Sequence, residues 1–244
     1  MAQPQEPVVH SQTPHEVKAA LEREIRARSR AVLLVNKRAR RGKKFYREAK
    51  RLLEERGIAL DGNYSALTAS DISTRVANAI AEGHRLIVVG GGDGTLSSVL
   101  PHFVHREVVL GILPLGTAND LARTLGIPTD PEGAARVILE GATRRVDLGE
   151  VNGHPFFNVA SIGLSVAVTE ELTRDLKRRW GTIGYAIATI RALWRMRPFS
   201  AEIRCDGEVV RVRSLQIAVG NGRHYGGGLT VDREARIDDE LLGP

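Results

Sequence analysis

The chain has 244 residues, which suits one large domain or two small ones, and its charged and apolar fractions are those of a globular protein. Its single cysteine, Cys205, excludes an intramolecular disulfide and a zinc site built from cysteines. The net charge of +6 favours anionic partners, and no apolar run is long enough for a membrane-spanning helix. These properties predict a cytoplasmic protein that touches a membrane only at its surface.

Residues 1–28 form an extension that precedes the first strand-like run. Residues 1–14 are polar and contain proline and glutamine, which predicts disorder. Residues 16–28 are charged and contain alanine. This composition favours a solvated helix over a membrane-surface helix, because the apolar face is thin.

Strand-like and helix-like segments alternate over residues 29–143. This alternation predicts an α/β domain with a parallel sheet and helices on both faces. The predicted strands are 31–35, 64–68, 86–89 and 108–113, and the predicted helices are 43–55, 72–81, 96–104, 121–125 and 134–139.

A glycine turn follows the third predicted strand and leads through Asp93, Gly94 and Thr95 into a helix. In such an arrangement the backbone N–H groups converge on a phosphate, and glycines let the main chain approach closely. A carboxylate beside phosphates indicates a shared cation or a proton to be moved. The turn therefore predicts nucleotide-phosphate binding, although a plain tight turn is the alternative that the local pattern leaves open.

A second turn after the fourth predicted strand supplies Thr117, Asn119 and Asp120. Their hydroxyl, amide and carboxylate groups could hold a ribose or phosphate oxygens. The alternative is helix capping, because Asn and Asp before an apolar run are favoured N-caps. Both turns follow parallel strands, and ligands bind at the carboxyl ends of such strands.

Residues 144–244 predict a second, β-rich antiparallel domain with one helical insertion over residues 166–197. Asp206-Gly207 is a typical hairpin turn. The histidines show no metal-ligand spacing, and His102 and His105 are expected to be exposed at a helix end. The predicted strands of this domain are 144–151, 156–161, 201–205, 208–219 and 229–231.

The paired motifs 91–95 and 114–123 resemble the catalytic domain of the diacylglycerol kinase and sphingosine kinase superfamily, and within it the bacterial lipid kinases. The resemblance extends to Phe157-Asn158, Gly220–Gly222 and Ile237–Asp239, and covers residues 30–244. It implies a nucleotide domain with an NAD kinase-like fold, a β-rich lipid-facing domain, and ATP in the cleft between them.

The resemblance implies an ATP- and Mg²⁺-dependent kinase that phosphorylates a hydroxyl of a membrane lipid, diacylglycerol-like, at the inner membrane face. Asp93 would have the catalytic role. Asp239 would hold Mg²⁺ together with the main-chain carbonyls of Arg236 and Leu241. The residues implied to bind ATP are Thr68, Gly92, Asp93, Gly94, Thr95, Leu96, Ser97, Ser98 and Thr117.

The sequence departs from the family pattern at four places. The turn 36–42 is longer and more basic than usual, Ser97-Ser98 replaces a common Asn-Glu pair, and Glu240 stands where glycine is usual. The chain also ends at Pro244, before the family's catalytic glutamate and last strands. We therefore expect the second domain to be incomplete, with open strand edges and uncovered apolar surface.

Two other functions remain open at this point. An NAD kinase shares the Gly-Gly-Asp-Gly-Thr loop, but the second turn argues against it. A catalytically silent ATP-binding module is the other alternative.

The expected partners are a membrane lipid, an anionic membrane surface and, as an open question, a second copy of the chain. Nucleic acid is not expected, because no binding motif accompanies the basic charge.

Overall fold

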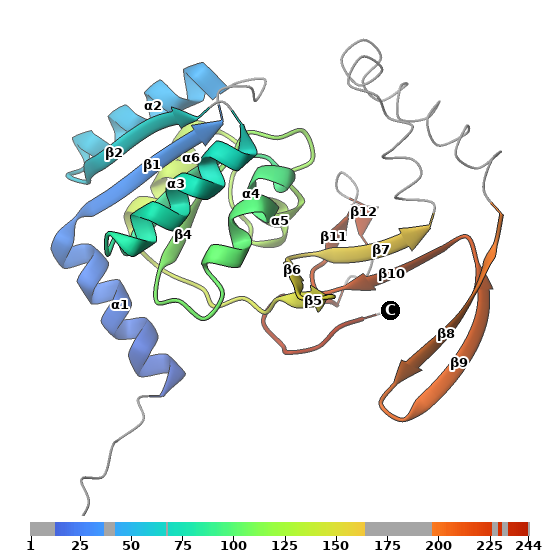
Figure 1. The fold of residues 1–244 in the computed structure, drawn as a ribbon. Helices are drawn as coiled ribbons and strands as arrows, with labels where there is room; N and C mark the ends of the chain where they lie inside the picture. The colour runs from blue at the N-terminus through green and yellow to red at the C-terminus, as the bar shows by residue number, and fades with distance from the viewer. Residues whose placement is uncertain are drawn as a thin grey trace, which may run out of the picture. The chain divides into compact units, whose positions relative to one another are not determined.

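The computed structural model describes residues 13–36, 42–66, 68–163, 197–225, 229–230 and 234–243. The chain divides into two compact units (Figure 1). The first unit comprises residues 1–146 and 224–229, and the second comprises residues 147–223 and 230–244.

The first unit is built on a four-stranded parallel sheet with the strand order β2-β1-β3-β4. Helices pack on this sheet, so the predicted α/β architecture is confirmed. The strands are β1 (Arg30–Asn36), β2 (Ala59–Ala66), β3 (Leu86–Gly91) and β4 (Val109–Pro114). The helices are α1 (Pro14–Arg28), α2 (Gly42–Glu55), α3 (Ala69–Ala81), α4 (Asp93–Val99), the 3-10 helix η1 (Leu100–His102), α5 (Asp120–Thr124) and α6 (Pro131–Glu140).

The core of the first unit lies on both faces of the sheet. All residues of β3 are buried, and in β1 the five apolar residues after Arg30 are buried. Leu33 and Val35 point to the core cluster that contains Phe45 and Ala49 of α2. Strands covered on both faces have continuous apolar runs, which is why they could be predicted from composition. Truncation of Leu33 to Ala would cost about 2–5 kcal/mol of stability.

Several predicted element boundaries in the first unit are wrong. β2 begins at Ala59 rather than residue 64, because pairing with β1 draws in an Asp-Gly-Asn stretch that has low strand propensity. Thr68, predicted as the end of that strand, is the N-cap of α3. The helix predicted over 96–104 begins at Asp93 and ends at Val99, so the residues after Gly92 are already helical.

The second unit contains short antiparallel strands, which confirms the predicted β-rich class. The pairs are β5 with β6, β7 with β10 and β8 with β9. The short strand β11 and the first residue of β12 (Figure 1) belong to the first unit, which includes residues 224–229. The strands after β4 are β5 (Gly149–Val151), β6 (His154–Phe156), β7 (Val159–Gly163), β8 (Phe199–Cys205), β9 (Glu208–Ser214), β10 (Gln216–Gly220), β11 (His224–Tyr225) and β12 (Leu229–Thr230).

The strand predicted over 144–151 is shorter in the structure, and the strand predicted over 208–219 is divided in two. Residues 142–148 form no strand, and Leu215 separates β9 from β10. The predicted turn at Asp206-Gly207 is confirmed, with φ of 48° and 84°, the positive values that a two-residue hairpin turn requires. The predicted helical insertion lies outside the described residues except for Arg197, which is not helical.

Asn221 joins three segments of the second unit and is only 2% exposed. Its Nδ2 donates to the main-chain oxygens of Asp147 (2.7 Å) and Phe157 (2.6 Å). Its main-chain N–H donates to the oxygen of Asn158 at 2.6 Å. These bonds bring together the Phe157-Asn158 and Gly220–Gly222 motifs, so here the family motifs serve the fold of this unit.

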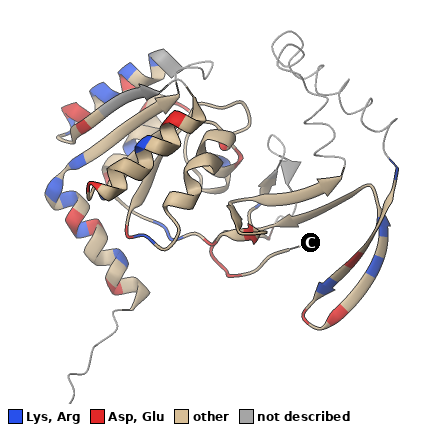
Figure 2. Cartoon of the chain, in the orientation of Figure 1, with Lys and Arg blue, Asp and Glu red and all other residues tan. Residues whose placement is uncertain are grey.

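Both units carry mixed charges, but the exposed large apolar side chains of the described residues differ between them. Figure 2 shows residues of both charges along α1 and along the β8–β9 hairpin, whereas β3 and β4 carry no charge. Among the described residues, the large apolar side chains that are exposed all belong to the second unit. They are Val151, Ile162, Val209, Val210, Leu241 and Leu242.

Candidate functional site

The two glycine turns are in direct backbone contact at the carboxyl end of the sheet. Leu115 N donates to Gly91 O at 2.8 Å. A Cβ atom on Gly92 would lie 2.8 Å from Gly116 Cα, and one on Gly116 would lie 2.6 Å from Gly92 Cα. A side chain at either position would push the turns apart, so both glycines are needed for this approach. The two motifs therefore form one continuous surface.

The first turn is supported by Thr95, a buried residue that is 6% exposed. Its Oγ1 accepts a hydrogen bond from Asn36 Nδ2 at 3.3 Å, and its side chain packs against Gly91. A Cβ atom on Gly91 would lie 2.5 Å from the Cβ of Thr95. The position after the turn, Gly94, has open space around it. Thr95 thus supports the turn, and Gly94 is the position that leaves room for a ligand.

The residues expected to bind ATP fall into two groups. Thr68 caps α3: its Oγ1 accepts from Asp71 N at 3.1 Å, and Asp71 Oδ2 accepts from Thr68 N at 3.1 Å. Ser98 Oγ donates to Thr95 O at 2.7 Å, and Leu96 is buried. The exposed positions in the set are Gly94, Ser97 and Thr117. Gly94, Ser97 and Thr117 are therefore available for direct contact with a ligand. Thr68, Leu96 and Ser98 instead position α3 and α4.

Asp93 connects the first turn to the second. Its Oδ1 accepts a hydrogen bond from Leu121 N at 3.2 Å, in the first turn of α5. Burial raises the pKa of the Asp93 carboxyl, the negative charge of Asp120 adds to the increase, and the hydrogen bond from Leu121 opposes it. A carboxylate with a raised pKa is a stronger proton acceptor, which suits general base catalysis.

Asn119 does not cap α5 with its side chain, so the capping expectation is wrong for this residue. It adopts a left-handed conformation with φ of 52° and makes no side-chain cap bond. Its Oδ1 accepts from Gly116 N at 2.8 Å and its Nδ2 donates to Gly116 O at 3.1 Å. The side chain thus closes the second turn on itself, and Asp93 accepts from the α5 N-terminus instead.

The expected metal ligands lie in the second unit, in a loop fixed by Asp147. Asp147 N donates to Ile237 O at 2.7 Å, and Asp147 Oδ2 accepts from Glu240 N at 2.6 Å. Asp239 Oδ1 accepts from Leu241 N at 3.1 Å. Within the described residues, no group of three His, Cys, Asp or Glu side chains could hold a metal ion. One carboxylate and two carbonyl oxygens are, however, hard oxygen donors of the kind that Mg²⁺ prefers.

A polar contact between α3 and the segment that follows α4 was not predicted from the sequence. His102, expected to be exposed, is half-buried, and its Nε2 lies 2.8 Å from Ser73 Oγ. His105 is exposed as expected. Neither Ser73 nor His102 stands in a motif, so no sequence signal could have paired them.

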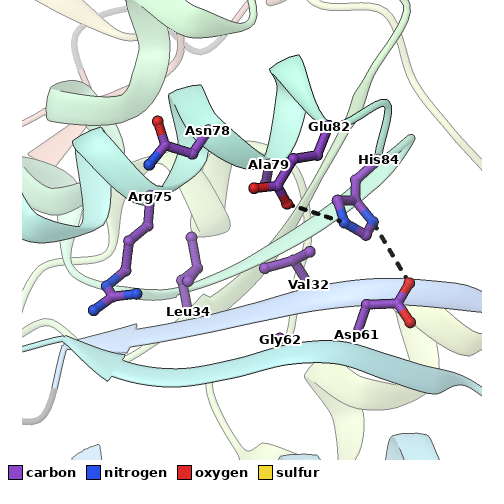
Figure 3. A pocket seen from close by; sticks show the side chains of 9 residues that line it. All are labelled: Val32, Leu34, Asp61, Gly62, Arg75, Asn78, Ala79, Glu82 and His84. Carbon is purple, nitrogen blue, oxygen red and sulfur yellow. Dashed lines mark ion pairs between the residues drawn. The ribbon is translucent and has the colours of Figure 1, made fainter.

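A pocket of about 130 Å³ lies elsewhere in the first unit, between α3 and strands β1 and β2. Figure 3 shows His84 between two carboxylates, with Nδ1 3.6 Å from Asp61 and Nε2 3.7 Å from Glu82. The lining includes no residue of either glycine turn, and the volume is below the range of ligand pockets that bind drug-sized molecules. We therefore do not assign the nucleotide to this pocket.

Family models match both parts of the chain. Residues 30–151 match the diacylglycerol kinase catalytic domain, and residues 158–243 match the YegS C-terminal NAD kinase beta sandwich-like domain. The chain belongs to the diacylglycerol kinase catalytic domain family. The predicted resemblance to bacterial lipid kinases is thereby confirmed.

Individual relatives agree with this assignment. The chain is 38% identical over 206 residues to a "Probable lipid kinase YegS-like" protein of Xanthomonas campestris, covering 80% of this chain and 66% of that protein. It is 41% identical over 174 residues to a protein of the same name from Pseudomonas aeruginosa, covering 68% and 56%. The chain thus spans less than two thirds of the length of these relatives.

A solved structure supports the fold. The crystal structure of a diacylglycerol kinase from Bacillus anthracis superposes with a TM-score of 0.72 at 29% sequence identity. The superposition covers 88% of this chain and 71% of that one. It confirms the predicted two-part fold, with a parallel-sheet domain followed by a β-rich domain.

Proposed function

We propose that this protein is an ATP-dependent kinase that transfers the γ-phosphate of ATP to a hydroxyl of a membrane lipid, diacylglycerol-like in its chemistry. The observation that carries the proposal is the backbone contact between Gly92 and Gly116, with Asp93 bonded across the two turns. The names of the relatives support a kinase-type function.

The ATP phosphates would lie at the first turn of α4. The first N–H groups of a helix have no partner within the helix and so are available to an anion. Gly94 leaves open space there, and Thr117 offers an exposed hydroxyl from the second turn. Phosphoryl transfer depends mainly on positioning and charge neutralisation, and these groups provide positioning.

Asp93 would accept the proton of the lipid hydroxyl as that oxygen attacks the γ-phosphorus. Its raised pKa increases its basicity, and the hydrogen bond from Leu121 N fixes its orientation. Asp239 and the carbonyls of Arg236 and Leu241 would hold Mg²⁺, whose donor preference they fit. Bound Mg²⁺ would add positive charge to this loop of the second unit.

The lipid substrate would be met at the inner face of a membrane, through peripheral contact with anionic phospholipid. The net charge of +6 favours this contact. No helix in the described part of the chain is long and apolar enough to cross a bilayer.

Transfer of radiolabelled phosphate from ATP to a panel of lipids in mixed micelles tests the proposal. We expect product with lipids that carry a free hydroxyl, and a loss of about 10²-fold or more for Asp93→Asn, as expected when a general base is removed. Asp206→Asn, an exposed turn position, is the matched control and should leave the rate unchanged. Binding of MgATP without any lipid product would contradict the kinase and favour the silent binding module.

A further inference from the structure

A chain of hydrogen bonds joins α3 to the end of α4. Ser73 Oγ, on α3, donates to Ser98 O at 3.0 Å, and His102 Nε2 lies 2.8 Å from the same Ser73 oxygen. Ser98 Oγ lies 3.4 Å from Ala69 O, in the first turn of α3. Because Ser98 uses its single hydroxyl hydrogen toward Thr95 O at 2.7 Å, the tie from α3 to the helix that follows the glycine turn is made by Ser73, to which His102 is bonded.

The number of hydrogens on each group determines which group donates in these hydrogen bonds. A serine hydroxyl has one hydrogen, and Ser73 uses it toward Ser98 O. The Ser73 oxygen is then an acceptor, so the hydrogen between Ser73 and His102 belongs to His102 Nε2. The geometry therefore assigns the Nε2–H tautomer, or the protonated ring, to His102.

The position of α4 depends on such contacts because the helix is short. It has 7 residues, and a helix of that length is not stable on its own. Its first turn follows Gly92 directly and carries the residues proposed to meet the phosphates. A tie at its carboxyl end, together with the hydrogen bond from Asn36 to Thr95 at its start, fixes both ends of the helix.

We propose that Ser73 and His102 are positioning residues that hold α4 in the geometry which receives the nucleotide phosphates. The inference rests on the proposed function, because it assumes that ATP binds at the first turn of α4. Both residues act through Ser98 and need no contact with the nucleotide. Loss of one such hydrogen bond is expected to weaken the dependent interaction about three- to tenfold.

The test compares Ser73→Ala with Thr74→Ala. Thr74 is the next residue on α3, and its Oγ1 bonds to Ser70 O within the same helix at 3.2 Å. Both variants lose a hydroxyl and gain helix propensity, but only Ser73→Ala breaks the tie to α4. Hydrogen exchange of the α4 amides is measured without nucleotide, and KM for ATP and kcat are measured with it.

The expected result for Ser73→Ala is faster exchange in α4 and a KM for ATP that rises about three- to tenfold, with a smaller change in kcat. His102→Leu should do the same, and His102→Gln, which keeps an N–H donor, should restore most of the loss. Thr74→Ala should match the wild type. Unchanged exchange in α4, or equal KM in the two alanine variants, would overturn the proposal.

The two proposals can fail separately. A wild-type chain that binds no MgATP contradicts the proposed function and, with it, the role of these residues in nucleotide binding. Exchange data from the same samples still decide whether Ser73 and His102 hold α4. Binding of MgATP with identical affinity in wild type and Ser73→Ala contradicts the positioning role alone.

Discussion

Among the single residues of the site, Asp93 has both a structural role and a proposed chemical role. Its carboxylate accepts from Leu121 N, which stabilises the N-terminus of α5. Burial and the neighbouring Asp120 nevertheless disfavour its charge and raise its pKa. A group whose charge is disfavoured in the folded state reduces stability at any pH where it is ionised.

Asp93→Asn is therefore expected to lower the proposed phosphate transfer about 10²-fold or more and to raise the free energy of unfolding at neutral pH. The folded state raises the pKa of Asp93, so its destabilising effect appears as pH rises above the unfolded pKa of about 4 and is absent below it. Asparagine keeps an oxygen for Leu121 N. Thermal unfolding at pH 7 and below pH 4 measures this: the gain should vanish in acid. A variant less stable than wild type at pH 7 would contradict it.

Glu240 stands where the family resemblance predicts glycine, and its backbone conformation favours glycine. Its φ is 59°, a left-handed conformation that glycine adopts without strain. Glu240→Gly should stabilise the second unit by about 0.5–1 kcal/mol, because the bond to Asp147 uses the main-chain N–H and is kept. Urea unfolding measures the change. Glu208→Gly, at a strand position without positive φ, should instead lower the free energy of unfolding by about 1 kcal/mol. Equal losses of unfolding free energy in the two variants would contradict this prediction.

The contact between the two glycine turns belongs to the scale of structural elements. It depends on the register of β3 and β4, in which Gly91 pairs with Pro114. Gly116→Ala would place a Cβ 2.6 Å from Gly92 Cα and 2.8 Å from Asn119 Oδ1. Because neither neighbour can move without opening a turn, we expect a loss of about 1–3 kcal/mol of stability and loss of MgATP binding.

Gly94→Ala is the matched comparison for this prediction. Nothing lies within 4 Å of a Cβ at Gly94, and the residue is in a helix, where alanine is favoured. Its melting temperature should equal or exceed that of the wild type. A Gly116→Ala variant with the same melting temperature as Gly94→Ala and normal MgATP binding would contradict the prediction. It would show that neither stability nor nucleotide binding depends on the close contact between the two turns.

The elements differ in how well the sequence predicts them. β1 and β3 were predictable because a strand buried on both faces is continuously apolar. β2 was predicted too short because its start is fixed by pairing with β1 and not by propensity. In the second unit, residues 208–219 were predicted as one strand, but Leu215 separates two strands that have different partners.

The candidate site shows the same limit. Both glycine turns could be located from sequence, because their positions after strands follow from chain order. The hydrogen bond from Leu121 to Asp93 and the pairing of Ser73 with His102 join residues 28 and 29 positions apart, and no periodicity predicts them. Tertiary contacts therefore decide which of the predicted residues can meet a ligand.

The whole molecule divides the proposed machinery between two units. Thr68, the first glycine turn and Thr117 belong to the first unit, whereas Arg236, Asp239 and Leu241 belong to the second. The large apolar side chains that are exposed among the described residues also belong to the second unit.

The proposed function requires that the two glycine turns together form the nucleotide site. Hydrogen exchange of backbone amides with and without MgATP tests it most directly, because it needs no lipid and maps the whole chain. We predict that MgATP protects amides of residues 90–98 and 114–121 together, and that the pocket around His84 is unchanged. Protection confined to one turn, or centred on residues 61–62 and 75–84, would contradict the claim.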